Sequence, residues 1–389
     1  MQIELPISKS IANRLLILQA IHGDGLMTVS ADLPDDVQIL HRALTTLNNA
    51  SNSSQSERPI GETPSYSPSG RPIAAQAASC SSIELGNCGT AMRFLTAYCA
   101  QLEGQTTILD GVERMRHRPI GQLVDALREL GAQIEYLGEA GFPPLCIKGA
   151  RLDKHRIITI NNPQSTQFVS ALLLIGANVQ TESTSPYITL TRALIEQYAL
   201  ASSPYRLSPL ALERDWSSAA FWYEYLALHG GEITLPDLSR DSLQGDKVVA
   251  DIFAHLGVHT NYTTEGIILS PIAYSEASNS PLSGRPIAAQ AVSRSKILIQ
   301  DFGTCPDLYP AVALACERLG VELHATGVES LPLKESDRLR AVREHRTDAD
   351  HRMAMALLIA GYEVDDTACI SKSYPHFLEH FRQLCKSSR

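Results

Sequence analysis

The sequence predicts an α/β protein of two domains, and three observations support this prediction. The chain has 389 residues, more than one ordinary hydrophobic core accommodates. Residues 122–149 and 246–271 share one plan, in which an apolar-periodic helix and a Leu-Gly stop precede two strand-like runs joined by a glycine turn. Residues 82–104 and 296–320 share another plan, a strand followed by a helix. Recurring pieces bury their apolar faces against one another, so we expect repeated structural units.

Two polar segments interrupt this pattern. Residues 50–81 and 274–295 are rich in Ser, Pro, Asn and Gly, and both contain the string SGRPIAAQA. Each segment precedes the strand of the recurring strand–helix piece, which predicts equivalent surface loops. Insertions into surface loops cost little conformational entropy. Neutral insertion is therefore the simpler interpretation, and a binding role is the alternative.

Composition and charge exclude several classes of protein. The net charge of −9 argues against a general nucleic-acid binder, so any anionic ligand must be held by local clusters of Lys and Arg. The sequence contains no apolar run long enough to span a membrane, and its first residues, MQIELPISKS, do not resemble a signal peptide. The eight cysteines show no metal-binding spacing, which predicts reduced thiols in a cytoplasmic protein.

The string SKSIANRLLILQA, residues 8–20, places Lys9, Ser10 and Arg14 at the entrance to an apolar helix. Backbone N–H groups point outward at a helix N-terminus, and such an end attracts anions. The pattern therefore indicates an anion cradle. Ordinary capping with a solvated charge is the alternative.

Three further motifs offer donors at predicted helix starts. LGNCGTAMRF (85–94) is a glycine turn in which Gly86 and Gly89 let a ligand approach the backbone. The run RMRHR (114–118) concentrates arginine ahead of a proline, and arginine binds phosphate or carboxylate through two parallel hydrogen bonds. PQSTQF (163–168) adds neutral hydroxyl and amide donors.

The most highly charged run, KESDRLRAVREHRTDADHRMAMALL (334–358), contains two cation-rich clusters. The helix predicted after Asp337 shows none of the Leu-Gly stop and hairpin that follow the corresponding helices elsewhere in the chain. A new helix opens instead, with Asp350 as its N-cap. The run therefore predicts two halves of one anion site, with a helix end and a hairpin missing after Arg338.

Together these strings resemble the EPSP synthase family of enolpyruvyl transferases. The resemblance covers nearly the whole chain except 50–81, 274–295 and about 340–349. Its two longest motifs, GNCGTAMRF and KESDRL, distinguish it from the related UDP-N-acetylglucosamine enolpyruvyl transferases. The motifs that follow the family's order are SKS, GNCGTAMR, RPI, STQF, SALL, QGD, PD, KESDRL, DHRMAM and SKSYP.

The resemblance implies a two-domain enolpyruvyl-transferase fold of repeated βαβαββ units, with one unit truncated. Residues 1–7 and 239–389 would form a discontinuous domain, and residues 8–238 a continuous one. The crossovers would lie near 6–9 and 236–242. It further implies a cytoplasmic monomer with no metal, no organic cofactor, no nucleic-acid partner and no membrane association.

The implied activity transfers the enolpyruvyl group of phosphoenolpyruvate to the 5-hydroxyl of shikimate 3-phosphate and releases phosphate, on the route to chorismate and aromatic amino acids. Both substrates are polyanions, which accounts for cationic motifs in an acidic chain. The truncation and the insertions favour an alternative, a relative that binds phosphorylated ligands with impaired or no turnover.

The resemblance also assigns residues to three overlapping sets. The acid/base carboxylates would be Asp307 and Glu335, assisted in catalysis by Lys9. Shikimate 3-phosphate would contact Lys9, Ser10, Arg14, Ser165, Thr166, Gln167, Tyr187, Asp307 and Lys334. Phosphoenolpyruvate would contact Lys9, Asn87, Gly89, Arg118, Gln167, Arg338, Arg352 and Lys372.

Overall fold

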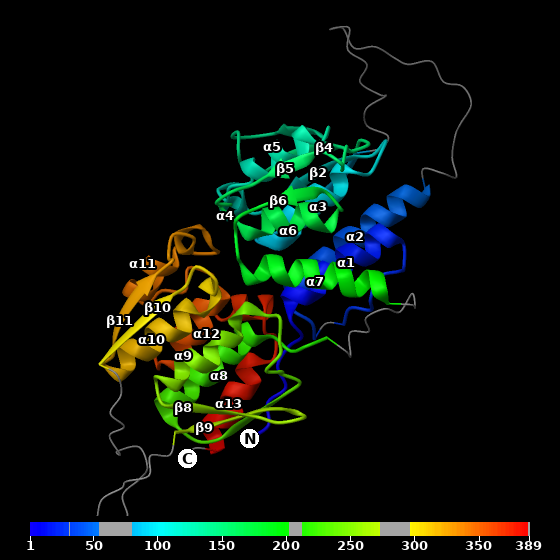
Figure 1. Ribbon diagram of the computed structural model, residues 1–389. Helices are drawn as coiled ribbons and strands as arrows, with labels where there is room; N and C mark the ends of the chain where they lie inside the picture. Colours follow the sequence, from blue (N-terminus) through cyan, green and yellow to red (C-terminus); the bar gives the residue numbers. More distant parts are fainter. Residues whose placement is uncertain (31, 54–79, 202–211, 273–295, 388–389) are drawn as a thin grey trace, which may run out of the picture. The chain divides into compact units, whose positions relative to one another are not determined.

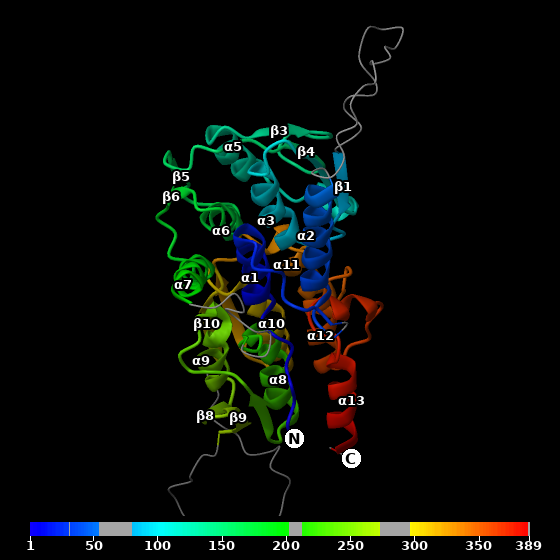
Figure 2. The ribbon, with the colours of Figure 1, turned by 90° about the vertical axis from the view of Figure 1, so that its right-hand side faces the viewer.

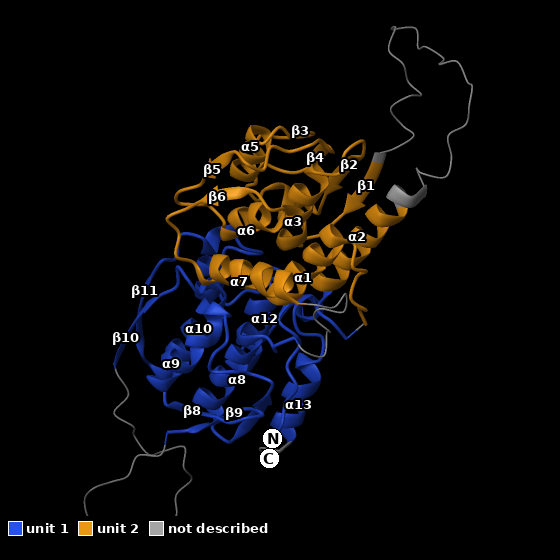
Figure 3. Ribbon diagram, turned by 45° about the vertical axis from the view of Figure 1, so that its right-hand side comes forward, with its two compact units in different colours: residues 1–9, 31–35, 211–389 blue, residues 10–30, 36–210 orange. Residues whose placement is uncertain are grey.

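The computed structural model is α/β and divides into two compact units (Figure 3). Unit 1 comprises residues 1–9, 31–35 and 211–389, and unit 2 comprises residues 10–30 and 36–210. The structure describes residues 1–30, 32–53, 80–201, 212–272 and 296–387. Most of the two polar segments, including both SGRPIAAQA strings, lies outside the described residues.

Unit 2 contains one complete βαβαββ arrangement. Its four-stranded sheet has the order β1-β2-β4-β3, with β1 parallel to β2 and the other two pairs antiparallel. A second sheet, β5-β6, is parallel. The strands are β1 (Cys80–Glu84), β2 (Thr106–Asp110), β3 (Gln133–Tyr136), β4 (Leu145–Lys148), β5 (Ile157–Thr159) and β6 (Asn178–Gln180).

The helices of unit 2 alternate with these strands. They are α1 (Lys9–His22), α2 (Asp35–Ser53), α3 (Gly89–Ala100), α4 (Glu113–Arg116), α5 (Gly121–Glu129), α6 (Thr166–Leu174) and α7 (Pro186–Leu200). Helix α3 contacts α5, α6, β2 and β4, and both α3 and α6 are buried on nearly every face. A helix that is apolar all round needs burial on all sides, and the sheets lie outside these helices (Figures 1 and 2).

Unit 1 repeats the same arrangement around the N-terminus. The sheet β7-β9-β8 is antiparallel, and Gln2 bridges Thr234 of β7 in parallel. The N-terminal segment therefore lies where a first strand belongs. The elements are α8 (Trp216–His229), β7 (Ile233–Pro236), the 3-10 helix η2 (Gly245–Val248), α9 (Val249–Ala254), β8 (Val258–Tyr262) and β9 (Gly266–Pro271). Both helix–hairpin pieces predicted from the sequence are confirmed, as α5-β3-β4 and α9-β8-β9.

A third arrangement stops halfway. Strands β10 (Ile297–Asp301) and β11 (Glu322–Thr326) are parallel and joined by α10, as β1 and β2 are joined by α3. Among the described residues, β11 has no second neighbouring strand, whereas β2 is paired on both sides. The prediction of a missing hairpin is thereby confirmed, whereas the helix Arg338–Glu344 does have an end, with His345 in the left-handed conformation. The remaining elements are η4 (Pro306–Leu308), α10 (Tyr309–Leu319), η5 (Leu331–Leu333), α11 (Arg338–Glu344), α12 (His351–Ile359), η6 (Ala368–Lys372) and α13 (Phe377–Ser387).

The second crossover lies earlier in the chain than the sequence suggested. Helix α8 contacts α9, α10 and α12, and it is buried along almost its whole length. Its Trp222 stacks on Phe377 with ring centroids 5.4 Å apart and donates a 3.2 Å hydrogen bond to Tyr374. Because these apolar side chains form the core of unit 1, residues 211–238 belong to that unit rather than to the expected 8–238 domain. The first crossover, between Lys9 and Ser10, is close to the expected position.

One acidic side chain of this core has no hydrogen-bond partner. Glu224 of α8 is 0% exposed, and neither carboxyl oxygen has a partner among the described residues. Burial raises the pKa of Glu224 well above its ordinary value of 4.5. The folded state therefore keeps a proton that the unfolded chain loses near pH 4.5. The free energy of unfolding must therefore fall as the pH rises from about 4.5 through the higher pKa of the folded state.

Replacing Glu224 with Gln should remove this pH dependence, because Gln has similar size and does not ionise. We expect Glu224→Gln to match the parent near pH 4.5 and to have a higher free energy of unfolding than the parent at pH 8. Urea unfolding at several pH values measures the difference. The matched control is Glu232→Gln, at an exposed position of the same unit. A constant difference across the pH range would contradict the prediction.

Candidate functional site

Two arginines of unit 1 converge on the carboxylate of Asp307, which lies in η4 just before α10. Asp307 Oδ1 accepts a 2.7 Å hydrogen bond from Arg338 Nη1, and Oδ2 accepts a 2.9 Å bond from Arg352 Nη2. The Nζ atom of Lys334 lies 3.5 Å from Oδ1. Arg338 is the first residue of α11 and Arg352 the second residue of α12, so two helix starts supply the cations for one carboxylate.

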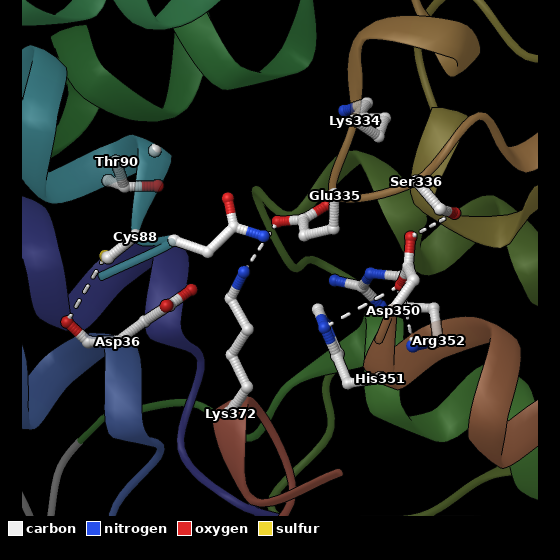
Figure 4. A network of polar contacts seen from close by, with 12 residues as sticks. Asp36, Cys88, Thr90, Lys334, Glu335, Ser336, Asp350, His351, Arg352 and Lys372 are labelled. Atoms are coloured by element: carbon white, nitrogen blue, oxygen red, sulfur yellow. Dashed lines mark hydrogen bonds and ion pairs between the residues drawn. The ribbon is translucent and has the colours of Figure 1, made fainter. Parts of the chain in front are cut away.

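Glu335 extends this network to the C-terminal part of the unit. Its Oε2 accepts a 3.1 Å hydrogen bond from Arg338 Nη2, and its Oε1 accepts a 3.0 Å bond from Lys372 Nζ. Figure 4 shows the Lys372 ammonium pointing toward Glu335. Two carboxylates assigned to proton transfer, Asp307 and Glu335, are therefore held by the same guanidinium.

Asp350 joins the two helix starts. Its Oδ1 accepts the backbone N–H of Arg352 at 2.9 Å and caps α12, as the sequence predicted. Its Oδ2 accepts 2.8 Å and 3.2 Å hydrogen bonds from Arg338 Nε and Ser336 Oγ (Figure 4). The Arg338 side chain is only 1% exposed. A cation so deeply buried needs several acceptors to offset its lost hydration.

The cations determine the charge state of Asp307. Burial alone would raise the pKa of this carboxyl, but Arg352, Arg338 and two lysine ammonium groups outweigh burial and hold the pKa well below 3.8. Asp307 is therefore ionised throughout the neutral pH range. The ionised form is the one that can accept a proton from a bound hydroxyl, and the low pKa also makes it a weaker base.

A second acid of the same unit behaves differently. Asp246, in the QGD motif, accepts a hydrogen bond from Ser217 Oγ. Burial raises the pKa of Asp246 to about 6, and the negative charge of Asp307 adds to this effect. The pKa of Asp246 is thus raised and that of Asp307 is lowered, and such opposite shifts are common in acid/base sites.

Arg352 retains capacity for another acceptor. Its Nη1 atom is buried, and no group in the described part of the chain accepts a hydrogen bond from it. The neighbouring His351 stays neutral, because burial and the charges of Lys9 and Arg352 hold its pKa well below 6.5. A buried guanidinium donor without an acceptor favours an anionic ligand.

Unit 2 presents a second pair of arginines, around the glycine turn. Arg93 Nη1 donates to the Gly89 carbonyl at 3.1 Å, and Arg118 Nη1 donates to the Asn87 carbonyl at 3.4 Å. A Cβ atom added at Gly89 would lie 2.5 Å from Arg93 Nη1 and 2.6 Å from both terminal nitrogens of Arg118. Only glycine therefore leaves both guanidinium groups where they are. The approach of a ligand at Gly86 and Gly89 stays a prediction, and in the structure the two guanidinium groups approach Gly89.

Neutral donors of unit 2 lie at the starts of two helices. Ser165 caps α6 by accepting the backbone N–H of Gln167 at 3.3 Å, and Gln167 Nε2 donates to Thr90 Oγ1 at 2.9 Å. Thr166 is the first residue of α6, and Tyr187 lies in the first turn of α7. Arg14 of α1 is buried, and burial lowers its pKa to about 10.

The structure distributes the predicted site residues over the two units as follows. Unit 1 holds Lys9, Asp307, Lys334, Glu335, Arg338, Arg352 and Lys372. Unit 2 holds Ser10, Arg14, Asn87, Gly89, Arg118, Ser165, Thr166, Gln167 and Tyr187. The sequence predicted no role for Arg93, Ser170, Thr191 or Asp246, and it predicted Asp350 only as a helix cap. Arg93, Ser170, Asp246 and Asp350 lie within motifs that carried the resemblance, and this was the signal that could have identified their roles.

The described ranges contain neither a metal-binding cluster nor a membrane-spanning helix. In these ranges, no group of three or more His, Cys, Asp or Glu side chains is arranged to hold a metal ion. Within the same ranges, no helix has both the length and the apolar character needed to cross a membrane.

Comparison with known proteins identifies the family. The family model for EPSP synthase (3-phosphoshikimate 1-carboxyvinyltransferase) matches residues 1–201, 203–345 and 344–381. The chain belongs to the EPSP synthase family. The second and third matches meet at residues 344–345, between Arg338 and Arg352. The interruption of the EPSP synthase pattern thus coincides with the missing hairpin.

Curated EPSP synthases align with almost the entire chain. It is 34% identical to the 3-phosphoshikimate 1-carboxyvinyltransferase of Bacteroides fragilis, over 98% of this chain and 94% of the relative. It is 30% identical to the enzyme of that name from Bordetella petrii, with the same coverage. The first alignment spans 440 positions, more than the 389 residues of this chain, so relatives carry residues that are missing here.

A solved structure supports the fold. The EPSP synthase of Acinetobacter baumannii covers 98% of this chain and 95% of its own, with a TM-score of 0.59 and 18% sequence identity. At this identity the likeness establishes the two-domain enolpyruvyl-transferase fold and nothing further.

The charge of Asp350 should be essential for stability. Asp350→Asn keeps an oxygen that can cap α12 but removes a charge from the buried guanidinium of Arg338. Removing one partner of a buried ion pair costs about 3–5 kcal/mol. We expect the free energy of unfolding of Asp350→Asn to fall by an amount that approaches this range. The loss is reduced because Asp307 and Glu335 still pair with Arg338. Urea unfolding measures it.

Asp348→Asn is the matched control in the same loop. Asp348 pairs only with Arg340 and Arg346 among the described ion pairs, and these arginine side chains are 55% and 60% exposed. Exposed pairs contribute about 0–1 kcal/mol. Equal losses in the two variants would show that the charge of Asp350 has no special role.

Proposed function

We propose that this protein transfers the enolpyruvyl group of phosphoenolpyruvate to the 5-hydroxyl of shikimate 3-phosphate and releases phosphate. The observation that carries the proposal is the network around Asp307, where an ionised carboxylate lies 2.7 Å and 2.9 Å from two arginine nitrogens. Family membership supplies the substrates. The network supplies groups suited to both anion binding and proton transfer.

In the proposed addition step, Asp307 accepts the proton of the 5-hydroxyl while the oxygen forms a bond to C2 of phosphoenolpyruvate. The C2–C3 double bond is consumed, and C3 takes up a proton to become a methyl group. Glu335, hydrogen-bonded to Lys372 at 3.0 Å, is the proposed proton donor to C3. Lys9 adds positive charge near the reacting groups, since it contributes to the low pKa of Asp307.

In the proposed elimination step, the C2–O bond to phosphate breaks and C3 gives its proton back, which restores the double bond. The departing phosphate carries the negative charge. Arg338, Arg352 and Lys372 are the cations proposed to hold it. The buried Nη1 donor of Arg352, which has no acceptor among the described groups, fits this role.

The other assigned residues are proposed as substrate ligands. Shikimate 3-phosphate would be held by Lys9, Ser10, Arg14, Ser165, Thr166, Gln167, Tyr187, Asp307 and Lys334. Phosphoenolpyruvate would be held by Lys9, Asn87, Gly89, Arg118, Gln167, Arg338, Arg352 and Lys372. We propose further that the protein acts as a monomer in the cytoplasm, without a cofactor or a nucleic-acid partner.

Phosphate release from the two substrates tests the proposal directly. We expect release only when both substrates are present. Asp307→Asn should lower kcat by about 100-fold or more, because a general base contributes roughly 10²–10⁴-fold, while calorimetric affinity for shikimate 3-phosphate stays within a few-fold. Asp348→Asn serves as the control with unchanged turnover. A parent protein that binds both substrates without releasing phosphate would be the binding-only relative, and the proposal would be wrong.

Gly89→Ala should weaken the binding of phosphoenolpyruvate and leave the binding of shikimate 3-phosphate nearly unchanged. The new methyl group would displace the guanidinium groups of Arg93 and Arg118, which lie 2.5–2.6 Å from its position. A displacement of about 1 Å at a binding group can cost on the order of 100-fold. We expect KM for phosphoenolpyruvate to rise at least tenfold and KM for shikimate 3-phosphate to change little.

Gly86→Ala separates this effect from backbone strain. Gly86 has a positive φ of 56°, and nothing lies within 4 Å of its Cβ position. The substitution strains the same turn without touching either arginine, so it should lower stability but leave KM for phosphoenolpyruvate near the parent value. Similar KM values in the two variants would contradict the steric explanation.

A further inference from the structure

The guanidinium of Arg14 is held by a buried network of neutral groups. Arg14 Nε donates to Thr191 Oγ1 at 2.7 Å, and Nη2 donates to Ser170 Oγ at 3.2 Å. Nη1 donates to the Ser10 carbonyl at 2.7 Å, and Nη2 also donates to the Tyr187 carbonyl at 3.2 Å. The side chains of Ser170 and Thr191 come from α6 and α7, and both residues are 0% exposed.

The hydroxyl groups of this network have little freedom. Thr191 has one hydroxyl proton, and its oxygen lies 2.7 Å from the Tyr187 carbonyl and 2.9 Å from Ser170 Oγ. Since Thr191 accepts the Arg14 Nε–H, its own proton must go to one of these two oxygens. The hydroxyls therefore fix one another and, through their lone pairs, the plane of the guanidinium.

These partners orient the cation but do not neutralise it. The described hydrogen-bond partners of Arg14 are two hydroxyls and two carbonyls, and its guanidinium carbon lies 5.5 Å from the Phe94 ring centroid. This contrasts with Arg338, whose guanidinium has three carboxylate partners. A guanidinium carries five N–H groups, and the four described bonds leave one Nη1 N–H for a ligand.

We propose that Thr191 and Ser170 are positioning residues, which fix the Arg14 guanidinium so that its remaining Nη1 N–H meets an oxygen of shikimate 3-phosphate. The inference rests on the proposed function, because it takes Arg14 as a ligand of that substrate. Neither residue contacts the substrate itself. Their contribution is to remove rotational freedom from Arg14 before the substrate arrives.

Thr191→Val tests this role, because Val has nearly the same shape and no acceptor for Arg14 Nε. We expect Kd and KM for shikimate 3-phosphate to rise by about 10- to 100-fold, while kcat and KM for phosphoenolpyruvate change by less than about threefold. Thr191→Ser, which restores the hydroxyl, should recover most of the affinity. Calorimetric titration with shikimate 3-phosphate gives Kd without depending on turnover.

Thr189→Val is the matched control on the same helix, since Thr189 is exposed. This variant should bind shikimate 3-phosphate like the parent. If Thr191→Val does not fold, Ser170→Ala decides by the same measurements, with a smaller expected rise. A variant that lowers the melting temperature but keeps the parent Kd would overturn the positioning role, as would a failure of Thr191→Ser to restore affinity. The parent titration separates the two hypotheses: a parent that does not bind shikimate 3-phosphate overturns the proposed function itself.

Discussion

The burial of Arg338 is the constraint on which the rest of unit 1 depends. A guanidinium that is 1% exposed has lost its hydration, and in the described part of the chain the carboxylates of Asp307, Glu335 and Asp350 offset that loss. These three acids precede α10, α11 and α12, so one cation holds together the segments that lead into three helices. Arg338 also helps to keep Asp307 ionised, together with Arg352 and Lys334. The cation that holds these segments together thus contributes to the charge state needed for chemistry.

Arg14 shows the opposite solution in unit 2. Its described partners are neutral, so its positive charge stays available to a ligand, whereas the charge of Arg338 is already shared among acids. The chain thus holds one buried arginine with neutral groups and another with carboxylates. The difference follows from which residues lie opposite each one. Hydroxyl-bearing helices α6 and α7 surround Arg14, and helix starts rich in Asp and Glu surround Arg338.

Much of the fold could be predicted because the chain repeats itself. The Leu-Gly stops and glycine turns marked both hairpins, and their absence after Arg338 marked the truncated unit. The boundary at residue 211 could not be predicted, because α8 is apolar on every face and such a helix fits the core of either unit. The roles of Asp350, Ser170 and Thr191 were also missed. Asp350 was identified only as a cap, and a hydroxyl on an apolar helix gives no sign of which distant cation it faces.

The short link between α11 and α12 has a consequence for the order of folding. Arg338 and Asp350 are separated by twelve positions, so their ion pair closes a small loop. A hairpin like β3–β4 in this place would more than double the separation and add about 0.6–1 kcal/mol of loop-closure entropy. Contacts between nearby residues form faster than contacts that close long loops. In this chain, therefore, the two helix starts that supply Arg338 and Arg352 can come together early, before strands distant in sequence have paired.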